Sequence, residues 1–111
     1  MTLNKWKICI NEPFDKCEYI YPIQQRKVKI LLDELKKNDL VRKIIIFGSS
    51  ITKRCHSGSD VDIYVEFDKD PKCIPIDCFV DFDYDFWDNY HVDQRLRNEI
   101  YKNGLILYER I

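Results

Sequence analysis

The feature that most constrains the fold is a run of apolar, mostly β-branched residues that stops at a glycine. Residues 43–47 read Lys-Ile-Ile-Ile-Phe, and Gly48 follows them directly. Consecutive apolar side chains over a strand-sized length are typical of a strand that is buried on both faces. We therefore expect this strand to lie at the centre of a sheet.

One helix is predicted before this strand. Residues 24–37 carry apolar side chains at helical spacing, with charged residues between them. The apolar positions are Val28, Leu31, Leu32 and Leu35. This pattern predicts an amphipathic helix that ends near Asn38 and covers the core.

The chain after Gly48 predicts two more strands, a short helix and a last strand. Residues 61–67 are apolar at odd positions and polar or aromatic at even ones, so one face is core and the other faces a site or solvent. A loop over 68–75 precedes a strand within 78–87, a helix over 93–102 that Asn103-Gly104 stops, and a strand over 105–108. Residues 6–10 are predicted as an edge strand.

The length and the charge of the chain favour a single domain that binds neither a nucleic-acid backbone nor a membrane. The 111 residues, 45% of them apolar, are the size of one domain that spans residues 1–111. Lys and Arg total 18 against 19 for Asp and Glu, so the net charge of −1 argues against a nucleic-acid partner bound through its phosphate backbone. The longest apolar runs fall far short of the roughly 20 residues that cross a bilayer. We expect no membrane association.

The cysteines favour a reducing compartment. There are five of them, none in a C-x-x-C pair, and the N-terminus lacks the pattern of a secretory signal. Neither Cys55-His56 nor the pair Cys73 and Cys78 has the spacing of a zinc site. We expect reduced thiols and a cytoplasmic location.

The stretch after the central strand carries the candidate chemistry. Gly48-Ser49 lets the backbone approach a phosphate with no side chain in the way, and a helix beginning at Ser50 would direct free N–H groups at the same anion. Asp60 and Asp62 stand two apart at the start of the next strand, so both carboxylates project from one face about 7 Å apart. Two such carboxylates suit divalent ions such as Mg²⁺. The alternative is a turn before a strand, since Ser57-Gly58-Ser59-Asp60 is also good turn chemistry.

A third carboxylate would complete a two-metal site. Asp81, Asp83 and Asp85 alternate with aromatic residues, which places all three on one side of the predicted strand. Only one of them is needed as a ligand, and the others would then lie on a solvated strand face.

These residues resemble the signature of the DNA polymerase β-like nucleotidyltransferases. Gly48-Ser49 is followed by ten residues and then by Asp60-Val61-Asp62. The small size and the ending over residues 85–89 and 103–110 are similar to the minimal nucleotidyltransferase (MNT) branch, whose members include antitoxins. The resemblance covers about residues 24–110.

The resemblance implies an α+β fold, with a mixed, twisted sheet and helices packed on one side. It also implies that Gly48 and Ser49 hold a nucleoside triphosphate, and that Asp60 and Asp62 are catalytic ligands of Mg²⁺ or Mn²⁺. The third acid, a metal ligand and general base, is expected on the strand before the last helix. That position favours Asp85, with Asp83 as the alternative.

One part of the motif departs from the family. Relatives often carry Arg-x-Arg-Gly soon after the Gly-Ser turn, whereas residues 50–54 here read Ser-Ile-Thr-Lys-Arg. Lys53 or Arg54 is expected to supply the cation for the triphosphate, and the alternative is that both are surface charges.

Two functions follow from the resemblance. The first is a metal-dependent nucleotidyltransferase that moves a nucleoside monophosphate, with AMP from ATP expected first, to a hydroxyl on a protein or nucleotide. The second is an antitoxin-like subunit with weak or lost activity, which acts by covering a partner. In the MNT branch that partner is often a HEPN ribonuclease toxin, and a homo-oligomer is left open.

Overall fold

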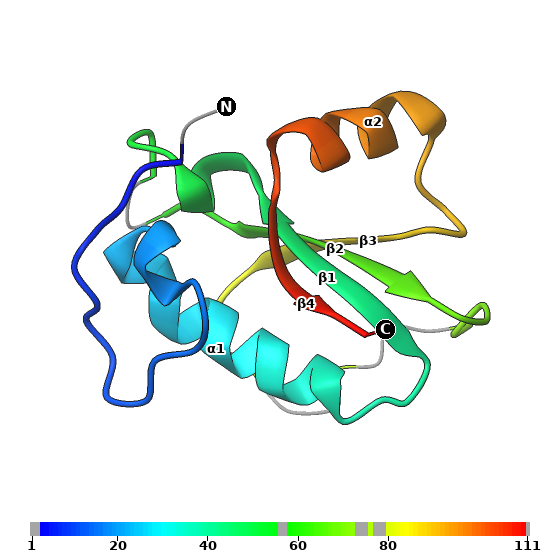
Figure 1. The fold of residues 1–111 in the computed structure, drawn as a ribbon, viewed down its shortest axis with the longest axis horizontal. Helices are drawn as coiled ribbons and strands as arrows, with labels where there is room; N and C mark the ends of the chain where they lie inside the picture. Colours follow the sequence, from blue (N-terminus) through cyan, green and yellow to red (C-terminus); the bar gives the residue numbers. More distant parts are fainter. Residues whose placement is uncertain (1–2, 56–57, 73–75, 77–79, 111) are drawn as a thin grey trace.

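The structure is a computed structural model that describes residues 3–55, 58–72, 76 and 80–110. Figure 1 shows a twisted sheet with the longest helix running beneath it. The elements in chain order are η1 (Cys17–Tyr19), α1 (Pro22–Lys36), β1 (Val41–Phe47), η2 (Gly48–Ile51), β2 (Val61–Phe67), β3 (Tyr84–Asp88), α2 (Gln94–Asn103) and β4 (Leu105–Glu109).

The sheet is mixed, and its strand order is β3-β2-β1-β4. β1 pairs antiparallel with both β2 and β4, whereas β2 and β3 run parallel. The central position predicted for residues 43–47 is confirmed, because β1 has a strand on each side and Ile44, Ile45 and Ile46 are all fully buried.

The α+β class is confirmed, but the helices do not share one side of the sheet as expected. Ile44 and Ile46 pack in the same cluster as Leu31 of α1, whereas Ile45 packs in a second cluster with Ile100 of α2. Successive side chains of a strand point to opposite faces. α1 and α2 therefore cover opposite faces, because β1 is apolar on both.

Helix α1 begins two residues before the predicted start. Pro22 occupies its first turn, where the missing N–H of proline is not needed and its fixed φ suits a helix. The four predicted apolar positions are buried, and so are two polar residues of the first turn, Gln24 and Gln25.

The edge strand predicted for residues 6–10 is wrong. The described residues 3–9 have no strand, and the segment crosses the start of α1 instead. The Trp6 backbone N–H donates to the Glu18 carbonyl at 2.7 Å, and the Cys9 N–H donates to Gln25 Oε1 at 2.7 Å. Backbone groups here are satisfied by a loop and a side chain, which leaves no ladder for a strand.

The third strand begins later than the alternation of residues 81–86 predicts. β3 starts at Tyr84, so Asp85 lies within it while Asp81 and Asp83 precede it. Residues 77–79 of the predicted strand lie outside the described residues. Only Asp85 of the three carboxylates therefore has its place set by strand pairing.

Strand β2 differs from expectation on its even face. Tyr64 and Glu66 were placed toward a site or solvent, but they are 0% and 3% exposed. The Tyr64 hydroxyl donates to Glu66 Oε2 at 3.0 Å, and Arg42 and Arg97 contact the same carboxylate at 3.2 and 3.7 Å. Burial and the neighbouring Glu66 raise the pKa of Tyr64 to about 12, so its hydroxyl stays protonated. These contacts link the buried Glu66 of β2 to Arg42 of β1 and Arg97 of α2.

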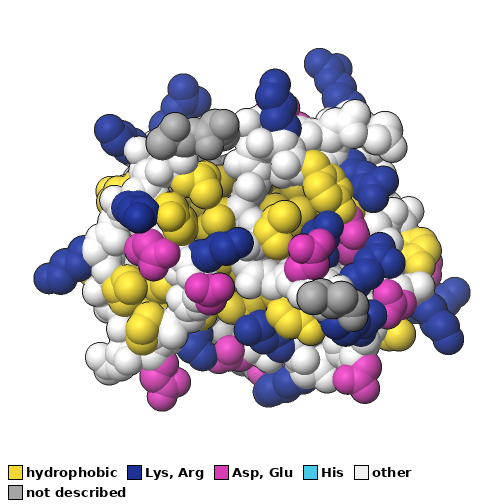
Figure 2. All heavy atoms as spheres, viewed as in Figure 1, with side chains coloured by type: hydrophobic (Ala, Val, Ile, Leu, Met, Phe, Trp, Pro, Cys, Tyr) yellow, Lys and Arg dark blue, Asp and Glu magenta, His cyan; other side chains and the backbone are white. Residues whose placement is uncertain are grey.

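None of the helices that the structure describes is both long enough and apolar enough to cross a membrane. On the face in Figure 2, basic and acidic side chains are interspersed.

We predict that Gly104→Ala lowers the free energy of unfolding by about 2 kcal/mol. Gly104 has an ordinary φ of −80°, so the reason is space: an added Cβ would lie 2.5 Å from Ile45 Cγ2 and 2.5 Å from the Ile100 carbonyl oxygen. Chemical denaturation measures the effect, with exposed Lys102→Ala in the same helix as the control. Equal stability of the two variants would contradict the prediction.

Candidate functional site

The site lies where β1 ends and β2 and β3 begin. In the sheet register, Phe47 of β1 pairs with Asp62 of β2, and Asp62 pairs with Asp85 of β3. The Gly48-Ser49 turn follows Phe47 directly. Strand pairing alone therefore brings the turn and two of the predicted carboxylates together, although they come from three segments of the chain.

Gly48 is in direct contact with Asp62. Its φ is +76°, a left-handed conformation that glycine adopts at little cost. A Cβ built on Gly48 would lie 2.2 Å from Asp62 Oδ2. Glycine is thus needed here both for the turn and to leave room for the carboxylate.

The turn continues as a single 3₁₀ turn, η2, rather than as the helix expected from Ser50. Thr52 N–H donates to the Ser49 carbonyl at 3.0 Å and ends the turn. Ser50 is fully buried, and its carbonyl accepts from Tyr21 N–H at 2.8 Å. A phosphate at this position would therefore meet the exposed backbone of a short turn and not the dipole of a helix.

The carboxylates of Asp62 and Asp85 form a close pair. Burial, a hydrogen bond with Asp85, and the charges of Asp85 and Asp60 raise the pKa of Asp62 to about 6. A hydrogen bond between two carboxyl groups requires that one of them carries a proton. A proton on Asp62 below about pH 6 relieves the repulsion that two like charges would otherwise exert on each other.

Asp60 lies near enough to Asp62 for its charge to contribute to the raised pKa. It is exposed and lines a shallow hollow of about 220 Å³ together with Asp81 and Asp83. Asp81 also forms an ion pair with Arg26 at 3.2 Å. Asp60 thus adds its charge to Asp62 and also lines the hollow beside Asp81 and Asp83.

The donor set suits a hard divalent ion only in part. Within the described ranges, no group of three acidic, histidine or cysteine side chains is arranged to enclose a metal ion. Mg²⁺, however, is usually held by one or two carboxylates with substrate phosphates and water. The pair Asp62 and Asp85, beside a turn open to a phosphate, fits that mode of binding.

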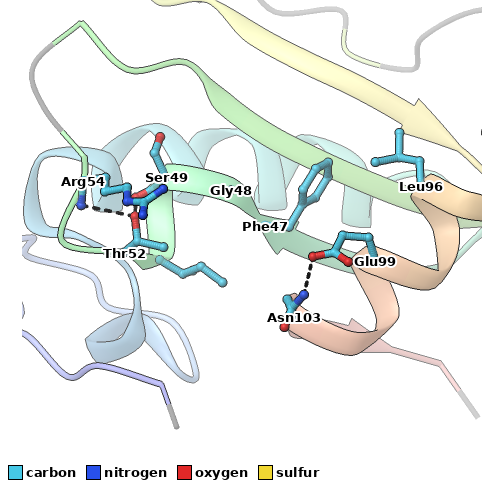
Figure 3. A pocket seen from close by; sticks show the side chains of 9 residues that line it. Phe47, Gly48, Ser49, Thr52, Arg54, Leu96, Glu99 and Asn103 are labelled. Atoms are coloured by element: carbon cyan, nitrogen blue, oxygen red, sulfur yellow. Dashed lines mark hydrogen bonds between the residues drawn. The ribbon is translucent and has the colours of Figure 1, made fainter. Parts of the chain in front are cut away.

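The two predicted cations differ in position. Arg54 lines an open pocket of about 490 Å³ that also includes Gly48 and Ser49, whereas Lys53 is not among its lining residues. Figure 3 shows Arg54, Ser49 and Thr52 on one side of this pocket and Phe47 with the α2 residues on the other. The geometry favours Arg54 over Lys53.

The α2 wall of this pocket was not anticipated from the sequence. It consists of Leu96, Glu99 and Asn103, which are spaced three or four apart and so lie on one helix face. That spacing was visible in the sequence, but it identifies a pocket wall only once α2 is known to lie over Phe47.

Gln24 was also missed. It lies on the helical stripe of Val28, Leu31 and Leu35, a position that signals burial, and its side-chain amide contacts both the turn and the Asp60 segment. A polar residue on an apolar helical stripe indicates a buried side chain that needs hydrogen-bond partners, and this signal could have identified Gln24 from the sequence.

Two aromatic residues of β2 and β3 and a histidine after β3 are packed against or bonded to neighbouring side chains. Tyr64 is in the core, and Trp87 packs against Phe47 with ring centroids 5.5 Å apart. His91 Nδ1 lies 2.9 Å from Asp88 Oδ1, well away in sequence from the turn. His56, Cys73 and Cys78 lie outside the described residues.

We predict that Gly48→Ala costs about 3 kcal/mol in wild type but only about 1–2 kcal/mol in an Asp62→Ala background. The left-handed φ is costly in both, whereas the overlap with Oδ2 exists only when Asp62 is present. Denaturant unfolding of the four proteins gives the coupling energy. Additive costs would show that the two residues are not in contact.

We predict that Asp62→Asn stabilises the protein at pH 7.5 by about 1 kcal/mol, a value reduced because the side chain is only half buried. The raised pKa means that wild type is most stable with Asp62 neutral, so this stability is present below about pH 4 and is lost as pH rises through 6. The asparagine is neutral throughout. Melting temperatures from pH 3.5 to 8 should therefore diverge above pH 4, and a destabilised variant at pH 7.5 would contradict the prediction.

Comparison with known families identifies the domain to which these elements belong. The family model described as "Nucleotidyltransferase domain" matches residues 28–109, which include β1, the turn, both carboxylate strands and α2. No curated protein sequence matches the chain. Because the match spans most of its length, the chain belongs to the nucleotidyltransferase domain family.

Proposed function

We propose that the chain transfers a nucleoside monophosphate, with AMP from ATP as the first expectation, to an acceptor hydroxyl and releases pyrophosphate. The observation that carries the proposal is the contact of Gly48 with Asp62, which in turn pairs with Asp85. A turn that exposes backbone to a phosphate thus adjoins two carboxylates that repel each other when both are ionised. Membership of the nucleotidyltransferase family supports transfer chemistry in general.

In this proposal the residues of the turn bind the triphosphate and the carboxylates bind the metal ions. Gly48 and Ser49 hold the triphosphate, with Arg54 at the same pocket as its cation. Asp62 and Asp85 would hold Mg²⁺ or Mn²⁺, with Asp60 near enough to add to their charge. When bound, such ions neutralise phosphate charge and lower the pKa of an attacking hydroxyl.

Asp85 is the better candidate for the general base. It is exposed on the edge strand β3, whereas Asp62 is half buried between β1 and β3. A general base must reach the proton that it removes, and an acceptor approaching from solvent meets Asp85 first. The acceptor is a hydroxyl of a protein or nucleotide, and a HEPN-type toxin is the partner that the resemblance to the MNT branch suggests.

A catalytically weak antitoxin-like subunit is the second candidate. It is favoured by the departure of residues 50–54 from the family pattern. Such a subunit would keep the fold and act by covering its partner. Binding of a triphosphate separates the two candidates.

We predict that ATP binds in the presence of Mg²⁺, loses affinity in EDTA, and binds Asp85→Asn about tenfold more weakly or worse. Asp83→Asn is the matched control, since Asp83 is another exposed aspartate two residues earlier and outside the Asp62 pair. Calorimetric titration of ATP and then of the other triphosphates measures the constants.

Equal losses of ATP affinity in Asp85→Asn and Asp83→Asn would contradict the assignment of the third metal ligand to Asp85. No binding of any triphosphate to the wild type would contradict the transferase proposal and favour the covering subunit.

A further inference from the structure

Gln24 is fully buried, and its amide contacts both the residue that follows the Gly48-Ser49 turn and the segment that leads into β2. Its Nε2 lies 3.1 Å from the Ser59 carbonyl, 3.4 Å from the Asp60 carbonyl and 3.3 Å from Ser50 Oγ. Carbonyl oxygens only accept hydrogen bonds, so the NH₂ end of the amide must face them. The orientation of the side chain is therefore fixed by its surroundings.

The oxygen of the same amide is buried without forming a stabilising hydrogen bond. Gln24 Oε1 has no hydrogen-bond partner among the described residues. A buried acceptor without a donor is unfavourable, so an apolar residue of the same size would avoid this loss. The contacts of Nε2 are what distinguish glutamine from such a residue.

These contacts join segments that strand pairing does not join. Ser50 follows the Gly48-Ser49 turn, and Ser59 and Asp60 lead directly into β2 and Asp62. The start of α1 holds the first segment twice, through Gln24 and through the bond from Tyr21 N–H to the Ser50 carbonyl. We propose that Gln24 is a positioning residue, which sets the Asp60 segment at a fixed place relative to the triphosphate turn.

The neighbouring Gln25 provides a matched control. It is also 0% exposed and lies on the same helical turn. Its amide, however, binds the N-terminal segment: Nε2 donates to the carbonyls of Lys7 and Ile20, both at 3.0 Å, and Oε1 accepts from Cys9 N–H. Substitution at either position therefore removes a buried glutamine, but only substitution of Gln24 removes contacts with the site.

The test compares Gln24→Met with Gln25→Met, since methionine matches glutamine in length and lacks its donors. The first readout is the amide resonances and hydrogen exchange of residues 58–62 by NMR. The second is calorimetric binding of ATP with Mg²⁺ and with EDTA. If Gln24→Met does not fold, Gln24→Asn takes its place, because it keeps the amide but is one methylene too short to reach.

We expect Gln24→Met to shift the amides of residues 59–62, to speed their exchange, and to weaken Mg²⁺-dependent ATP binding about tenfold. Gln25→Met should leave these amides and the affinity unchanged. Unperturbed amides in Gln24→Met, or equal effects of the two variants, would overturn the positioning role.

The affinity readout rests on the proposed function, whereas the NMR readout does not. Wild type that binds no triphosphate would refute the proposed function, and the amides of residues 59–62 would still decide whether Gln24 holds the segment. The two failures are therefore distinguishable.

Discussion

The burial of β1 on both faces is the interaction on which the structure depends, because it holds two mutually repelling carboxylates side by side on neighbouring strands. Asp62 and Asp85 are register partners in a parallel pair, and burial with mutual repulsion favours a proton on Asp62. A flexible loop would let such groups move apart. The fully buried isoleucines of β1, with a helix packed on each face, supply the rigid sheet that keeps them together.

The space around this pair is set by residues that carry no charge. Gly48 leaves room for the Asp62 carboxylate, and the Gln24 amide contacts the Ser50 hydroxyl on one side of the site and the Ser59 carbonyl on the other. The shape of the candidate site therefore depends on the absence of a side chain at one position and on a neutral amide at another. Neither contribution is visible in a count of acidic residues.

Much of the fold and part of the candidate site could be predicted from the sequence, for identifiable reasons. The strand over 61–67 and the central strand carry strong local patterns, and the Gly-Ser turn and Asp-x-Asp are defined by short spacing. The partner of Asp62 was not fixed in this way, because alternation gives Asp81, Asp83 and Asp85 the same face and only the start of β3 at Tyr84 separates them. The burial of Tyr64 and Glu66 depends on where α2 packs, which local pattern does not encode.

The parallel direction of β2 and β3 gives the sheet two unlike ends. The turn and the carboxylates lie where β2 begins, and the seven residues of β2 extend about 20 Å at the usual rise, to Phe67. At that far end Phe67 pairs with Val41, and Asp68 N–H donates to the Leu40 carbonyl. An insertion at the exposed Lys69, just after the contacts that hold Asp68, would therefore place a reporter or an affinity tag at the opposite end of β2 from the candidate site.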